Sequence, residues 1–206
     1  ALAESKRSLE LKPLHLAQNA IEGLLLLNAG RTDEALLQLQ KTSELEPKFW
    51  MPHMFTASAY IEKGMYAEAI AESRKEYELS GGNVYPFGIY ALARSGQRDE
   101  AQAALKGLLQ SSATKYVPPY NIALIYNGLE MRDDALLWLE KAYEERFASL
   151  PYLAVDPAFA ALIRTACEYA RMPAADAERR AAGMAQELDR HLAVELGVEG
   201  GVDRDG

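Results

Sequence analysis

Four short segments contain an acidic residue followed directly by alanine: DEA at 33–35, AEA at 67–69, DEA at 99–101 and DDA at 133–135. Their alanines lie 34, 32 and 34 residues apart, and Ala1 lies a further 34 residues before Ala35. The segments SLELKP at 8–13, SELEP at 43–47 and YELSG at 77–81 keep the same 34-residue spacing. Self-similarity at a fixed period is typical of repeat proteins, so the chain is expected to be an array of repeat units.

Each repeat unit is predicted to contain two helices. The first is apolar at helical spacing and ends near a glycine, as in IEGLLLLNAG (21–30), TASAYIEKG (56–64) and IYALARSG (89–96). Glycine adopts the left-handed conformation that ends many helices. The second helix begins at the acidic residue and alanine and keeps its apolar residues on one face. The pattern therefore predicts an all-α fold.

This pattern resembles the tetratricopeptide repeat over residues 1–147. The resemblance implies a right-handed superhelix of antiparallel helix pairs, with a partial unit at 1–13 and units at about 14–47, 48–81, 82–115 and 116–147. Two departures, Ile89 at a small-residue position and Glu130 at a glycine position, predict adjusted turns in the third and fourth units. Besides the alanines, the matching residues are the small residues Gly23, Ala57 and Ala123, the tyrosines Tyr60 and Tyr126, the glycines Gly30, Gly64 and Gly96, and Pro47.

Residues 116–159 are similar to the end of the repeat arrays that bacteria attach to winged-helix regulators, protein kinases and nucleotide cyclases. The matching residues in the last part are Tyr152, Leu153, Asp156, Pro157 and Phe159. Asp156 can cap a helix that begins at Pro157 and carries Phe159 on its apolar face. A second helix is predicted to end near Leu196. We expect residues 148–196 to cap the end of the array and residues 197–206 to be disordered.

The sequence predicts neither catalysis nor a bound metal or cofactor. The three histidines, His15, His53 and His191, are far apart and belong to no HExxH pattern. The single cysteine, Cys167, excludes an internal disulfide and lies on a predicted apolar helix face, where a thiol is a poor nucleophile. The SGGN segment at 80–83 is read as a turn, because no Lys-Ser or Lys-Thr pair follows it.

Charge and hydropathy narrow the classes of partner. The net charge is −8, and neither half of the chain is basic, so nucleic acid is not an expected partner. The longest aliphatic run, Leu24 to Leu27, is far shorter than the roughly 20 apolar residues that cross a bilayer. We expect a cytoplasmic location with no membrane contact. Because the leading unit is truncated and residues 116–159 show the resemblance described above, we also expect these residues to belong to a larger bacterial regulatory protein.

The tetratricopeptide geometry implies an inner wall formed by the first helix of each unit. Its apolar side chains would contact a peptide or protein partner, while Asn28, Asn127 and Arg94 would bind the partner's backbone or an acidic group. Arg94 is the sole cation predicted on this wall, which disfavours recognition of a terminal carboxylate by several cations. The predicted groove residues are Leu24, Leu27, Asn28, Met54, Ser58, Ile61, Tyr90, Arg94, Tyr120, Leu124 and Asn127.

Two functions remain open at the level of sequence. The first is a non-catalytic protein-protein interaction module. The second is a self-assembling structural module, whose groove is filled by its own C-terminal helices or by a second copy in a homo-oligomer.

Overall fold

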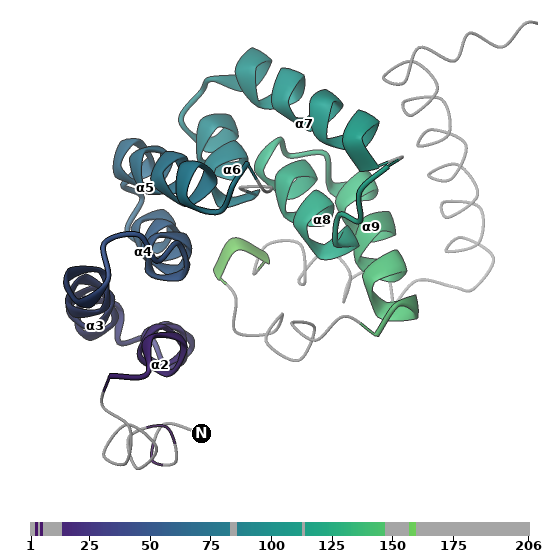
Figure 1. Cartoon of the computed structure of the whole chain (residues 1–206). Helices are drawn as coiled ribbons and strands as arrows, with labels where there is room; N and C mark the ends of the chain where they lie inside the picture. The colour runs from purple at the N-terminus through teal and green to yellow at the C-terminus, as the bar shows by residue number, and fades with distance from the viewer. Residues whose placement is uncertain are drawn as a thin grey trace, which may run out of the picture.

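The computed structural model describes residues 14–82, 86–112, 114–146 and 157–159, together with Ala3 and Ser5. In this part of the chain the regular elements are all helices, which confirms the prediction of an all-α architecture there (Figure 1). The α-helices are α2 (Leu16–Asn28), α3 (Thr32–Leu45), α4 (Met51–Glu62), α5 (Tyr66–Leu79), α6 (Pro86–Arg94), α7 (Arg98–Ser112), α8 (Pro119–Gly128) and α9 (Arg132–Glu144). A 3-10 helix, η2, spans Pro157–Phe159.

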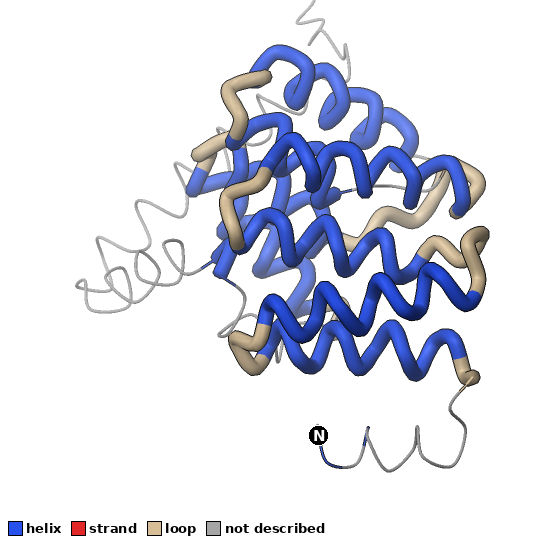
Figure 2. Tube along the Cα trace, turned by 90° about the vertical axis from the view of Figure 1, so that its left-hand side faces the viewer, coloured by secondary structure: helices blue, strands red, loops and turns tan. Residues whose placement is uncertain are grey.

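Neighbouring helices pack in sequence order. The pairs α2–α3, α4–α5, α6–α7 and α8–α9 each lie inside one of the four units defined from the sequence, and α3 and α5 pack on the helix that follows them. The first helices of the pairs, α2, α4, α6 and α8, also contact one another in succession. Figure 2 shows the successive helices lying beside one another as an array. We call the surface formed by α2, α4, α6 and α8 the first-helix face.

The turn inside each pair follows one hydrogen-bond pattern. In the first pair, the amide of Gly30 donates to Leu27 and that of Arg31 donates to Leu26, at 2.8 and 2.9 Å. In the fourth pair, Glu130 and Met131 make the equivalent bonds at 3.1 and 3.0 Å, and Glu130 has a φ of 63°, close to the 70° of Gly30. The expected adjustment of this turn was therefore wrong. The surrounding bonds hold Glu130 in a left-handed conformation that costs a non-glycine residue about 1–2 kcal/mol.

Small residues allow the two helices of a pair to approach closely. A Cβ atom at Gly23 in α2 would lie only 2.5 Å from Leu39 Cδ2 in α3, and the equivalent residues Ala57 and Ala123 are fully buried. In the third pair this position holds the larger Ile89, and α6 packs on α7 much less extensively than the helices of the other pairs pack. A branched side chain at this position separates the two helices.

In the third pair, therefore, the packing of α7 on its neighbours differs from that in the other pairs, whereas the turn between the two helices does not. The turn between α6 and α7 keeps the common hydrogen bonds, with Gln97 donating to Leu92 at 3.0 Å, so the adjustment expected there was also wrong. Helix α7 barely contacts α8, while α6 packs extensively on α8. Gly128 permits this contact, because a Cβ there would lie 3.2 Å from the Cα atom of Tyr90.

Two hydrophobic clusters form the interior. The first joins residues of α2, α3 and α4, with Leu39 fully buried at its centre. The second and larger cluster runs from α5 to α9 and includes Phe159, which is also fully buried. Phe159 thus packs against the core, as its predicted apolar face requires, although residues 157–159 form a 3-10 helix. The other predictions for residues 148–206, including those for Cys167 and His191, and most of the partial unit at 1–13 lie outside the described residues.

Candidate functional site

A short segment of the chain itself lies on the first-helix face. The 3-10 helix η2 contacts both α8 and α4, which are separated in the row by α6 (Figure 1). The side-chain amide of Asn127 donates a hydrogen bond to the carbonyl oxygen of Ala158. The ring of Phe159 packs on that of Tyr120 with 5.3 Å between centroids, at a tilt of 51°. Residues 157–159 of the same chain are therefore held on this face through one backbone carbonyl and one aromatic side chain.

The predicted groove residues fall into three groups by exposure. Four are buried by contacts within the chain: Leu27, Tyr90, Tyr120 and Leu124. Six are half-buried and keep part of their surface: Leu24, Asn28, Met54, Ser58, Ile61 and Asn127. Only Arg94 is exposed. The uncovered apolar surface among these residues is consequently concentrated on α2 and α4, at the opposite end of the row from α8.

Two of the predicted polar contacts have different surroundings. Arg94 is paired within the chain, since its guanidinium lies 2.8 Å from the Glu130 carboxylate. A hydrogen bond with Tyr66 and the pairing with Glu130 raise the pKa of Arg94, so it stays charged. In contrast, the side-chain nitrogen of Asn28 is buried and has no hydrogen-bond partner among the described residues. A buried amide N–H without an acceptor is costly, so a hydrogen bond donated by Asn28 Nδ2 to a carbonyl oxygen of a partner would lower the free energy.

Two histidines have partners that the sequence did not predict. The ring of His15 accepts a hydrogen bond from the amide of Gln18 at 3.2 Å and so caps the start of α2. The ring of His53 lies 2.6 Å from the carboxylate of Glu72, which also accepts a hydrogen bond from Lys75 at 2.7 Å. Burial alone would raise the pKa of Glu72, but these two hydrogen bonds lower it overall. Both histidines therefore make structural contacts between or within helices.

One buried carboxyl group, that of Glu76, differs from the carboxylate of Glu72 in its surroundings. Glu76 on α5 is 3% exposed, and its Oε2 atom has no hydrogen-bond partner in the described parts of the chain. Burial raises the pKa of Glu76 to about 8, so the group is mostly protonated at neutral pH. No group of three histidine, cysteine, aspartate or glutamate side chains suited to a metal ion occurs within the ranges described.

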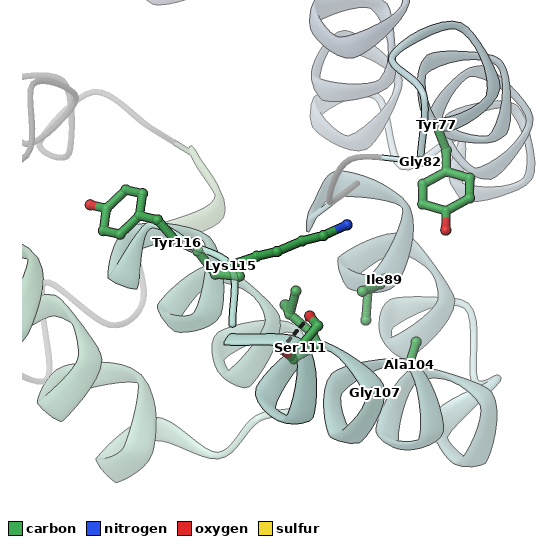
Figure 3. Close-up of a pocket in the computed structure, with 10 residues that line it drawn as sticks. Tyr77, Gly82, Ile89, Ala104, Gly107, Ser111, Lys115 and Tyr116 are labelled. Carbon is green, nitrogen blue, oxygen red and sulfur yellow. Dashed lines mark hydrogen bonds between the residues drawn. The ribbon is translucent and has the colours of Figure 1, made fainter. Parts of the chain in front are cut away.

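A pocket of about 630 Å³ lies beside the displaced helix α7 (Figure 3). Its walls come from α6 and α7, from the end of the α5 segment at Tyr77 and Gly82, and from the connection between α7 and α8. No pattern in the sequence predicted this pocket. Its one sequence signal is Ile89, the large residue at a position where the other units have glycine or alanine.

Comparison with protein-family models and with curated proteins gives no match for this chain. Among the helices described here, none is both long and apolar enough to cross a membrane.

Proposed function

We propose that this chain is a non-catalytic, tetratricopeptide-like interaction module that binds an extended peptide or a protein partner on its first-helix face. In this proposal the helix pairs form a right-handed superhelix, and the module belongs to a larger bacterial regulatory protein. The observation that carries the proposal is the docking of Pro157–Phe159 on α8 and α4.

The chemistry of that docking is transferable to a partner. The Asn127 amide binds a backbone carbonyl, which every peptide offers, and the contact with Tyr120 selects an aromatic ring. Leu24 and Met54 extend the apolar surface onto α2 and α4, where both keep partial exposure. Methionine adapts its shape to different partners. The expected partner is thus an extended segment with at least one aromatic residue, which crosses the face toward α2.

The open end of the face can be tested with peptides selected on the wild-type chain from a random displayed library. Met54→Glu and Leu24→Glu should each weaken binding of the selected peptides by at least tenfold, because a buried carboxylate opposes apolar contact. Leu37→Glu is the matched control, since Leu37 is 54% exposed and lies on α3, outside this face. Circular dichroism checks that each variant keeps its helices. Equal binding by all four chains would show that the first-helix face is not the binding surface.

The second candidate function, a module whose face is filled by itself, is favoured by the same contact between Phe159 and Tyr120. A synthetic peptide with the sequence of residues 152–161 separates the two. If the face is a peptide-binding site, a Phe159→Ala chain should bind this peptide, whereas the wild-type chain and a peptide lacking the phenylalanine should not bind. If a second copy fills the face, the wild-type chain should instead show a mass that rises with concentration in light scattering, and Phe159→Ala should abolish this rise.

A further inference from the structure

The pocket beside α7 lies at the helix pair that packs least extensively. Ile89 lines the pocket from α6, at the position where Gly23, Ala57 and Ala123 allow the other pairs to close. Opposite it, α7 presents Ala104, Gly107 and Leu108. The volume of about 630 Å³ lies within the range of pockets that hold small organic ligands.

Part of the pocket lining is apolar. Ile89, Leu108 and Val117 line the pocket and are 3%, 7% and 7% exposed, and the part of each side chain that faces it is hydrocarbon. Gly107 adds depth, because a Cβ atom built on it would meet no atom within 4 Å. Burial of methylene groups against such a surface stabilises a complex through the hydrophobic effect.

The pocket lining also carries one positive charge. Lys115 is the cation among the described lining residues, which include no aspartate or glutamate. Figure 3 shows its side chain extending across the pocket toward the side where Tyr77 and Ile89 lie. The hydroxyl of Ser111 already donates to the carbonyl of Leu108 at 2.8 Å, so Lys115 is left as the charged donor for a ligand. A single ammonium group matches a single negative charge, whereas phosphate groups are usually bound by several donors or by arginine.

We propose that this pocket binds a small amphipathic monocarboxylate, with its carboxylate on Lys115 and its aliphatic chain between Ile89, Leu108 and Gly107. This site is separate from the first-helix face and does not depend on the proposed peptide binding.

Octanoate is a suitable probe, with octan-1-ol as the matched neutral ligand. Binding is measured on the full chain by changes in two-dimensional amide NMR spectra, in which the Gly107 amide reports directly from the pocket. As the octanoate concentration rises, the amide signals of Gly107 and its neighbours should shift and then reach a plateau. Octan-1-ol should bind about tenfold more weakly, the factor expected for one charge-assisted contact.

Three variants locate the two parts of the ligand. Lys115→Gln should weaken octanoate by about tenfold and leave octan-1-ol unchanged. Gly107→Leu should abolish binding of both probes, because the new side chain occupies the open space. Gly107→Ala is its control and should bind both probes much as the wild-type chain does.

Several outcomes would overturn the proposal. These are the absence of any saturable shift with octanoate, equal affinity for both probes that Lys115→Gln does not alter, and unchanged binding by Gly107→Leu. If Gly107→Leu does not fold, the comparison of the two probes on the wild-type chain and on Lys115→Gln still decides between the outcomes.

Discussion

Replacement of Gly23 by alanine should destabilise the chain, whereas the same replacement at Gly107 should stabilise it. Both glycines lie inside helices, α2 and α7, where alanine is favoured over glycine by about 1 kcal/mol. At Gly107 the added Cβ meets nothing within 4 Å, so this gain is kept in full. At Gly23 the Cβ would lie 2.5 and 2.6 Å from Cδ2 and Cγ of Leu39.

The contact with Leu39 determines the sign of the effect at Gly23. Leu39 is fully buried, so it cannot relieve the contact by turning out into solvent. Overpacking of this kind costs about 1–3 kcal/mol, which exceeds the helix-propensity gain of about 1 kcal/mol. We expect a net loss of about 1 kcal/mol for Gly23→Ala and a gain of about 1 kcal/mol for Gly107→Ala. For a chain of 206 residues, each change corresponds to about 2–4 °C in melting temperature, in opposite directions.

Urea unfolding followed by circular dichroism measures both free energies of unfolding. A double-mutant cycle with Leu39→Ala supplies the control: once the leucine is shortened, Gly23→Ala should become stabilising, with a coupling energy of about 2 kcal/mol. If Gly23→Ala instead stabilises the chain as much as Gly107→Ala does, Leu39 moves aside without cost. The explanation of close pair packing by small residues would then be refuted.

Three further substitutions test the packing and the charges. Gly128→Ala should cost about 1–3 kcal/mol in urea unfolding, because the new Cβ meets the backbone of Tyr90 at 3.2 Å; no loss would show that α6 and α8 can separate freely. Glu130→Gly should stabilise by about 0.5–1 kcal/mol, since relief of the left-handed conformation outweighs an exposed ion pair with Arg94. Glu130→Gln, which keeps the conformation, should show no such gain. The pKa of Glu76 is raised to about 8 from 4.5, so the folded state holds its proton more tightly than the unfolded chain. That contribution to stability is complete below pH 4.5 and is lost as the pH rises through 8. Between pH 5 and pH 8 the wild-type chain should lose more than about 1 kcal/mol of unfolding free energy relative to Glu76→Gln, and a difference between the two that does not change with pH would contradict the assignment.

The sequence was sufficient to predict the helix pairs because their signals are local. Ala35 and its equivalents mark the second helix of each unit, and Gly30 and its equivalents end the first. The glycines act through their conformational preference, and the alanines act through close contact between adjacent helices. Both requirements recur in every repeat unit. Where a local preference was broken, at Glu130, the neighbouring hydrogen bonds kept the turn unchanged.

The burial of the predicted groove residues depends on contacts that do not recur with the 34-residue repeat. Tyr120 was predicted to face a partner but lies under Phe159, which follows it by 39 residues and belongs to no repeat unit. Tyr90 is buried where α8 approaches α6 at Gly128, beside the displaced helix α7. A single large residue, Ile89, marks that displacement in the sequence, but its size alone does not reveal whether the turn or the helix packing changes.

The common turn also has a consequence for how such a chain can change in length. Each of the four turns inside a pair contains only three residues. The connection between α3 and α4 contains five residues and is stabilised mainly by local hydrogen bonds, such as the one that the Phe49 amide donates to Glu46. A duplicated helix pair would therefore bring its own rigid turn and join its neighbours through the looser connections. The helix pair is therefore the unit by which the array can be lengthened or shortened. A reporter domain inserted between two pairs, at residues 46–50, should disturb the packing least.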